Sequence, residues 1–147
     1  MPTQSVAKLI EEKRMKKIMW LSLMALVSST SFAGYDAVNL ITQVKKDENK
    51  VLVADSVGKT LYVFDLDKEA ALPKCNADCA EVWPPYLITE EEAATVKAPL
   101  GVIARANKKM QLTYDGRPVY TYIFDRSQGD DKGDGLGGVW HDIELEE

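Results

Sequence analysis

Two stretches of this 147-residue chain repeat one pattern: residues 58–67 read GKTLYVFDLD and residues 116–125 read GRPVYTYIFD. Glycine, an apolar residue, tyrosine, a second aromatic residue and aspartate recur in both at an offset of 58 positions. A tryptophan follows each copy, Trp83 after the first and Trp140 after the second. A repeat of this length indicates that one supersecondary unit is duplicated, with repeat one over about 50–85 and repeat two over about 109–141.

Each repeat carries the signals of a β-hairpin. In the first, a β-branched run, a turn and an aromatic return strand over 61–64 predict a hairpin across residues 50–65. In the second, Asp115-Gly116 separates two alternating runs, which is a strong hairpin signal. We expect its return strand to run from Val119 to Phe124, with Pro118 at its start, where a missing N–H does no harm. Further strands are expected at 38–44 and 101–105.

Short helical segments interrupt the strands. Thr89 and Glu92 have the spacing of a capping box, so a helix of about two turns is expected to end near Val96. Residues 78–83 can form one further turn, and residues 127–138, rich in glycine and aspartate, are expected to be a loop. The predicted fold is mainly β: a single antiparallel β domain over residues 34–147, built from two pseudo-repeated meanders with short helical inserts. The two tyrosine strands should superpose when one half is rotated onto the other.

The N-terminal region has the form of a signal peptide, predicted over residues 15–33. Two lysines follow Met15, an apolar run covers residues 18–27, and the small residues Ser31 and Ala33 suit cleavage after Ala33. The apolar run is shorter than the roughly 20 residues that span a bilayer. A retained amphipathic anchor helix is the alternative. We therefore expect a periplasmic or secreted protein without stable membrane insertion after cleavage.

Residues 1–14 add nothing to this signal and are interpreted as an upstream extension, which leaves the start open between Met1 and Met15. The whole chain has a net charge of −5, and residues 34–147 alone have a net charge of −8. An acidic surface repels phosphate backbones and anionic lipids. Nucleic acid is therefore not an expected partner.

The repeated aromatic and aspartate residues have two interpretations. Alternate strand residues face the same side, so Tyr62 shares a face with Phe64, and Tyr120 with Tyr122. In one interpretation the aromatic rings are core and each aspartate caps a turn. In the other, the hydroxyls and carboxylates line a shared polar groove that binds a ligand or partner. The candidate binding residues are Tyr62, Phe64, Asp67, Trp83, Tyr120, Tyr122, Asp125 and Trp140.

The chain resembles the family of secreted repeats named for a Y-x-(F/W/Y)-x-x-D motif, often described as predicted lipoproteins. The residues that carry the resemblance are, in order, Tyr62-x-Phe64-x-x-Asp67, Cys75-x-x-x-Cys79-Ala80-x-x-Trp83-Pro84-Pro85, Tyr120-x-Tyr122-x-x-Asp125, Gly129-Asp130 and Gly137-Gly138-Val139-Trp140-His141. The resemblance covers nearly all of residues 34–147. It implies an exported repeat domain without an assigned activity, for whose relatives envelope or electron-transfer roles are proposed. No cysteine lies at the cleavage site, which disfavours a lipid anchor.

Cys75 and Cys79 are the only cysteines, and in an exported protein they are expected to form a disulfide. Residues four apart on a helical turn have Cα atoms about 6 Å apart, which is within disulfide reach. So small a loop is worth about 2 kcal/mol on the chain-entropy model. The spacing is neither the C-x-x-C of redox enzymes nor the C-x-x-C-H of haem attachment.

A metal site is the alternative use of these residues. Reduced Cys75 and Cys79 with His141, the only histidine, and with Met110 would suit copper or zinc. The acidic loop from Asp130 resembles a calcium loop only loosely. No familiar hydrolase, phosphate-loop or metalloprotease motif is present.

Two functions of different classes follow. The first is an exported, non-enzymatic periplasmic module that binds an unidentified envelope partner or small ligand and needs no cofactor. The alternative is an envelope redox or metal-binding protein of the electron-transfer type, with copper or zinc. The oxidation state of the cysteines and the metal content of the purified protein distinguish them.

Overall fold

The computed structural model describes residues 39–145. The predicted signal peptide and the first residue of the strand expected at 38–44 lie outside the described residues. The strands are β1 (Ile41–Lys45), β2 (Val51–Asp55), β3 (Tyr62–Phe64), β4 (Leu87–Ile88), β5 (Leu100–Ala104), β6 (Met110–Tyr114), β7 (Arg117–Tyr120), β8 (Trp140–Asp142) and β9 (Glu144–Leu145). The helices are α2 (Asp78–Val82), α3 (Glu90–Thr95) and the 3-10 turns η1 (Asp65–Asp67) and η2 (Leu136–Gly138).

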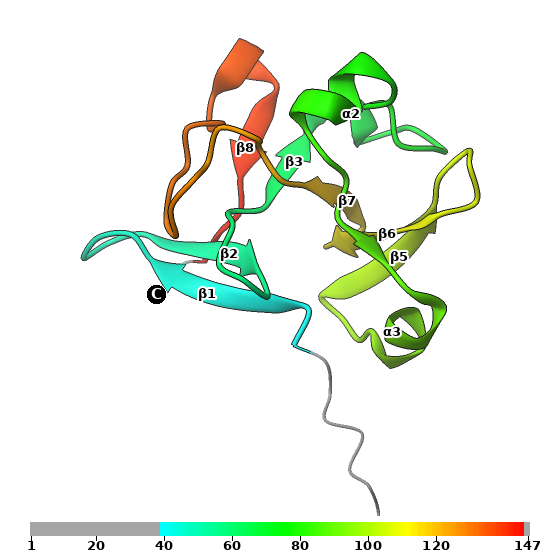
Figure 1. Cartoon of the computed structure of the whole chain (residues 1–147), viewed down its shortest axis with the longest axis horizontal. Helices are drawn as coiled ribbons and strands as arrows, with labels where there is room; N and C mark the ends of the chain where they lie inside the picture. Colours follow the sequence, from blue (N-terminus) through cyan, green and yellow to red (C-terminus); the bar gives the residue numbers. More distant parts are fainter. Residues whose placement is uncertain (1–38, 146–147) are drawn as a thin grey trace, which may run out of the picture. The chain divides into compact units, whose positions relative to one another are not determined.

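The strands form two antiparallel sheets, which confirms the predicted mainly β class (Figure 1). The smaller sheet has the order β1-β2-β9. The larger has the order β4-β6-β7-β3-β8, and β5 also pairs with β6. The two repeats meet in the larger sheet, where β3 pairs with β7 and Tyr62 lies opposite Tyr120.

The two halves exchange their last strands. In the larger sheet β8 from the second half pairs with β3 from the first, while Pro85 from the first half bridges Tyr120 of the second. In the same way β9 pairs with β2 from the first half, and β4 pairs with β6 from the second. Each half is therefore completed by the other through corresponding strand pairs, and the repeat seen in the sequence extends to the strand pairing.

Each predicted hairpin forms only beside its turn. Asp115 and Gly116 have φ angles of 46° and 75°, so they form the expected left-handed two-residue turn between β6 and β7. The prediction of a hairpin across residues 50–65 is wrong beyond Leu61, whose N–H still donates to Val53 O at 2.9 Å. Ala54 bridges Thr60, but β3 then leaves β2 and pairs with β7 and β8. Strand addition from the second repeat on both sides of β3 takes the place that β2 would have filled.

The second return strand is shorter than predicted. It ends at Tyr120 instead of Phe124 because the following backbone bonds elsewhere. Thr121 N–H donates to Pro84 O at 2.9 Å, and Asp125 N–H donates to Tyr122 O at 3.2 Å, which turns the chain. The turn brings Asp125 back over the sheet.

The helical segments lie where the sequence places them. Glu92 N–H donates to Thr89 Oγ1 at 3.1 Å and Thr89 N–H donates to Glu92 Oε2 at 2.7 Å, which confirms the capping box of α3. The one-turn helix predicted at 78–83 is α2. The loop predicted at 127–138 contains one short ordered element, η2, in which Gly137 has a positive φ.

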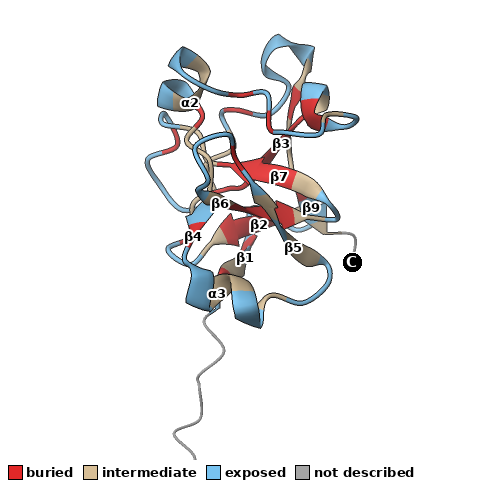
Figure 2. Cartoon of the chain, turned by 90° about the vertical axis from the view of Figure 1, so that its right-hand side faces the viewer, coloured by how far each residue is buried: buried red, intermediate tan, exposed pale blue. Residues whose placement is uncertain are grey.

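Two hydrophobic clusters cover opposite sides of the central strand pair. Val63 and Val119 pack with Leu112 in the aliphatic cluster. Tyr62 and Phe64 pack with Cys75, Trp83, Tyr120 and Trp140 in the aromatic cluster. The alternation along β3 is that of a strand buried on both faces. Figure 2 shows buried residues concentrated on β2, β3, β6 and β7, with exposed residues on α2 and α3.

Candidate functional site

The motif tyrosines and aspartates pair across the two repeats. Tyr62 Oη donates to Asp125 Oδ2 at 2.6 Å, and Tyr120 Oη donates to Asp67 Oδ2 at 2.7 Å. Both tyrosines are fully buried, and the aspartates are 6% and 2% exposed. Each repeat thus supplies a donor to the aspartate of the other, and none of the four side chains faces solvent in this structure.

The second oxygen of each aspartate closes a loop within its own repeat. Asp67 Oδ1 accepts from Lys74 N–H at 2.7 Å, and Asp125 Oδ1 accepts from Lys132 N–H at 3.0 Å. In both repeats the donor lies seven residues after the aspartate. The aspartates therefore connect a loop of one repeat to a strand of the other, a broader role than the turn cap of the core interpretation.

Burial favours the neutral forms of both tyrosines and of Asp125. Burial raises the pKa of the Tyr62 hydroxyl well above its usual range, and the Asp125 carboxylate raises it further. The Tyr120 pKa is raised in the same way by burial and by Asp67. Burial also raises the pKa of Asp125, although the Tyr62 hydrogen bond opposes this shift. Both hydroxyls therefore remain protonated donors.

Four aromatic rings form a continuous stack through the second cluster. Trp83 and Trp140 lie face to face with ring centroids 3.8 Å apart and planes 4° apart. Phe64 stacks on the outer face of Trp140 at 4.2 Å, and Tyr122 on the outer face of Trp83 at 4.3 Å. The second aromatic residue of each motif thus packs on the tryptophan of the other repeat. This is a further contact that only the paired repeats can make.

The two cysteines form the predicted disulfide, with Cα atoms 5.2 Å apart. His141 lies elsewhere, with Nε2 2.9 Å from Asp65 Oδ2. Met110 packs against the aliphatic cluster, whereas Cys75 belongs to the aromatic one. Within residues 39–145 no group of three or more His, Cys, Asp or Glu side chains could hold a metal ion. The structure therefore does not bring the ligands of the copper or zinc alternative together.

The acidic loop uses its carboxylates internally. Asp130 Oδ2 accepts from Arg126 N–H at 3.0 Å, and Lys132 Nζ lies 2.8 Å away. Asp131 forms ion pairs with Lys46 and Lys50. The ion pairs of Asp131 hold the acidic loop against the turn between β1 and β2.

A buried arginine that the sequence analysis did not single out holds the disulfide loop. Arg105 Nη2 donates to Cys75 O and to Asn76 Oδ1, both at 2.7 Å. Its Nη1 donates to Gln111 Oε1 at 2.6 Å, and Gln111 in turn donates to Val119 O at 2.9 Å. Both residues occupy positions that strand alternation marks only as inward-facing, so the sequence carries no specific signal for this network.

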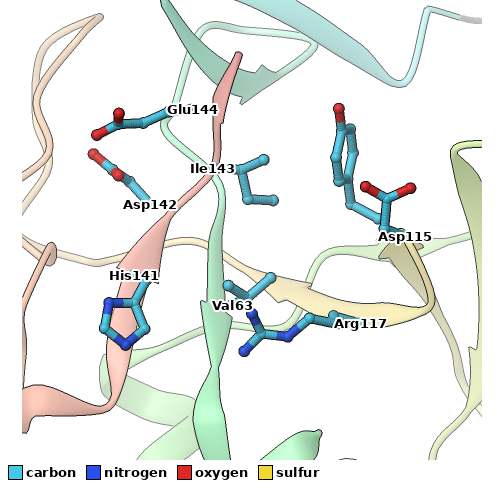
Figure 3. A pocket seen from close by; sticks show the side chains of 8 residues that line it. Val63, Asp115, Arg117, His141, Asp142, Ile143 and Glu144 are labelled. Atoms are coloured by element: carbon cyan, nitrogen blue, oxygen red, sulfur yellow. The ribbon is translucent and has the colours of Figure 1, made fainter. Parts of the chain in front are cut away.

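A pocket of about 280 Å³ lies between β7 and the chain that runs from β8 into β9 (Figure 3). Its apolar lining is Val63, Ile143 and the ring of Tyr114, and its polar lining is Arg117, His141, Asp115, Asp142 and Glu144. In Figure 3 the Arg117 side chain extends from β7 toward the side of the pocket that carries β8. Residues of both repeats thus place a cation, an imidazole and an apolar wall in one small cavity.

One carboxylate organises the charges beside this pocket. Asp65 Oδ1 accepts from Arg117 Nη2 at 3.2 Å, and Asp65 Oδ2 lies 2.9 Å from His141 Nε2. Lys68 Nζ is a third neighbour, 3.0 Å from Oδ1. Hydrogen bonds with Lys68 and then His141 lower the pKa of Asp65 to about 2. Arg117 Nε is buried and has no hydrogen-bond partner within residues 39–145.

The pocket breaks the symmetry of the repeats. At the repeat offset of 58, Arg117 corresponds to Lys59 and Asp65 to Ile123. Asp142 lies opposite Tyr62 as Pro85 lies opposite Tyr120, so His141 corresponds to Pro84. The counterpart surface on the other half therefore lacks the carboxylate and the imidazole. A residue-by-residue comparison of the two repeats would have drawn attention to these positions in the sequence.

Comparison with models of known protein families identifies the family of the chain. The model of a family described as a secreted repeat of unknown function matches twice, over residues 43–86 and 101–143. The chain belongs to this family. The two matches end at Tyr86 and Ile143, which hold the same place in the two halves: Tyr86 N–H donates to Val119 O at 3.0 Å and Ile143 N–H donates to Leu61 O at 3.2 Å.

Membership in a family of secreted repeats agrees with the export predicted from the N-terminal segment. Searches of curated proteins and of solved structures found no match to the chain. In the part of this secreted repeat that the structure describes, no helix has the length and apolar character needed to cross a membrane.

Proposed function

We propose that this secreted repeat is an exported, non-enzymatic binding module of the periplasm, and that its ligand site is the pocket beside Arg117 and His141. The observation that carries the proposal is the contrast between duplicated and unduplicated residues. The duplicated motif residues are buried and hydrogen-bond to one another in the core; they are Tyr62, Tyr120, Asp67 and Asp125. The pocket, by contrast, is built from residues that occur in one repeat only.

The fold itself does not require the unduplicated residues. The same strand pairing is made in the other half with Ile123, Lys59 and Pro84 at the corresponding positions. A partly exposed Asp65–Arg117–His141 group is therefore an addition to a scaffold that forms without it. Concave, mostly apolar sites with a few convergent polar groups are the usual form of small-molecule sites.

A fragment screen by nuclear magnetic resonance tests the proposal. The ¹⁵N-labelled protein is mixed at millimolar concentration with small acids, bases and neutral compounds. We expect at least one class to shift the amides of Val63, Ile143 and Arg117, which line the pocket, and to leave the α3 amides in place. The Lys59→Gln variant, altered at the counterpart position, should give the same shifts. The proposal is wrong if no fragment moves the pocket amides.

The second candidate is an envelope redox or metal-binding protein of the electron-transfer type, with copper or zinc as the bound metal. The stack of Phe64, Trp140, Trp83 and Tyr122 favours it, because closely stacked rings provide electronic contact through the core. Free-thiol titration and elemental analysis of protein purified from the periplasm test it. Stoichiometric copper or zinc that is lost when Cys75 and Cys79 are replaced would favour this candidate over the binding module.

A further inference from the structure

We infer that the pocket takes the carboxylate of a small organic acid, with Arg117 as the carboxylate ligand and Val63 and Ile143 as the wall for the hydrocarbon part. This inference rests on the proposed binding function. It names the chemical class of the ligand, which neither the motif nor the family description supplies.

The first argument is that the guanidinium of Arg117 has a hydrogen-bond donor without an acceptor. Its Nη2 has one contact, 3.2 Å from Asp65, and its Nε is buried without a partner among the described residues. A buried donor that lacks an acceptor is unfavourable, so an acceptor that reaches it gains binding free energy. The planar guanidinium fork matches carboxylate geometry, which makes an acid the natural acceptor.

The second argument is the local charge. Asp65 is a single carboxylate shared by two permanent cations, Arg117 and Lys68, and by His141. Positive charge at this side of the pocket is therefore only partly neutralised.

Three carboxylates, those of Asp115, Asp142 and Glu144, also line the pocket, and Asp142 Oδ2 is buried without a hydrogen-bond partner among the described residues. Lys50 offsets the charge of two of them. Asp142 and Glu144 lie 2.7 Å and 2.6 Å from Lys50 Nζ. In Figure 3 both carboxylates lie across the β8–β9 chain from Arg117. Asp115 is exposed at the turn between β6 and β7, where solvent screens its charge. Immediately around the guanidinium, two cations therefore share the single carboxylate of Asp65, which favours an anion at Arg117.

The third argument is size and lining. About 280 Å³ corresponds to about nine water molecules at roughly 30 Å³ each. Val63 and Ile143 are 6% and 8% exposed and offer an apolar surface beside the cation. Inorganic phosphate would accept hydrogen bonds from Arg117 but would leave the apolar surface of Val63 and Ile143 in contact with water. A short monocarboxylate with an apolar body uses both features.

Benzoate and its neutral analogue benzamide are suitable probes, with inorganic phosphate as the third ligand, all at one ionic strength. Each is titrated into the wild type, Arg117→Gln and Lys59→Gln, and the pocket amide shifts are followed. We expect benzoate to bind the wild type at least tenfold more tightly than benzamide or phosphate. Arg117→Gln should weaken benzoate binding at least tenfold, whereas Lys59→Gln should leave it unchanged.

The outcomes separate the inference from the proposed function. Equal binding of benzoate and benzamide, or benzoate binding that survives Arg117→Gln, overturns the acid class and leaves a binding pocket. Phosphate binding as tight as benzoate also overturns it, because the apolar wall then has no role. Absence of pocket shifts with benzoate overturns the inference, and absence with every fragment of the screen overturns the proposed function as well. Should Arg117→Gln fail to fold, the wild-type comparison of benzoate with benzamide decides alone.

Discussion

At the residue scale, the paired tyrosines and aspartates determine how the two repeats are joined. Tyr62→Phe removes the 2.6 Å hydrogen bond to Asp125 and leaves a buried carboxylate with one protein donor fewer. We expect the free energy of unfolding to fall by about 1–3 kcal/mol, the cost of leaving a buried polar group without its hydrogen-bond partner. Urea unfolding of the variant and the wild type measures this difference.

Tyr122→Phe is the matched control for this change. Its ring stacks on Trp83, but its hydroxyl makes no hydrogen bond within residues 39–145. The free energy of unfolding should therefore change by less than about 0.5 kcal/mol, as for most changes away from such features. Equal effects of the two substitutions would show that the Tyr62–Asp125 bond has no special role.

Asp65 should contribute to loss of stability in acid. Lys68 and His141 hold its pKa at about 2, below the ordinary value of 3.8. Because the folded-state pKa is the lower one, the stabilisation is present above about pH 4 and is lost as the pH falls toward 2. Asp65→Asn should therefore lose less stability than the wild type between pH 5 and pH 2, measured by urea unfolding. Asp130 also has a pKa of about 2, so its protonation should still destabilise the Asp65→Asn variant in acid. The variant therefore retains part of the loss of stability.

At the element scale, the disulfide fixes the short segment that carries Trp83 onto the sheet. Cys75 is fully buried in the aromatic cluster, and α2 follows it directly. Joint replacement of both cysteines by alanine should lower the free energy of unfolding by about 2 kcal/mol or more and the melting temperature by several degrees. The circular dichroism spectrum should remain that of the wild type, because the strand pairing does not involve this segment. An unchanged melting temperature would contradict the prediction.

At the scale of the whole molecule, the exchange of β4 and β9 between halves makes each half incomplete. Residues 39–98 lack the partners of Asp67 and Trp83, and residues 99–145 lack those of Asp125 and Trp140. Chains of about 60 residues or fewer are marginal alone, because they bury only about 60% of the surface that the unfolded chain exposes. Each half expressed separately should give a poorly dispersed nuclear magnetic resonance spectrum, and mixing the two should restore dispersion. A well-dispersed spectrum from either half alone would contradict an obligate exchange.

The sequence by itself determined the features that depend on neighbouring residues. The capping box at Thr89, the Asp115-Gly116 turn, the strand alternation around Tyr62 and the Cys75–Cys79 disulfide all follow from local spacing. The internal repeat also fixed the mainly β class and the duplicated plan, because equal residues at equal spacing build equal elements.

Only the tertiary structure decided which residues meet across the repeats. No local pattern reveals that Tyr62 bonds the aspartate of the other copy, that Trp83 stacks on Trp140, or that β3 leaves β2 for β7. The pocket arose in the same way, from His141 and Arg117, which meet at Asp65 although it lies more than 50 residues earlier in the chain. These contacts depend on how two similar units pack against each other, and the free energy of that packing is a property of the pair rather than of either stretch.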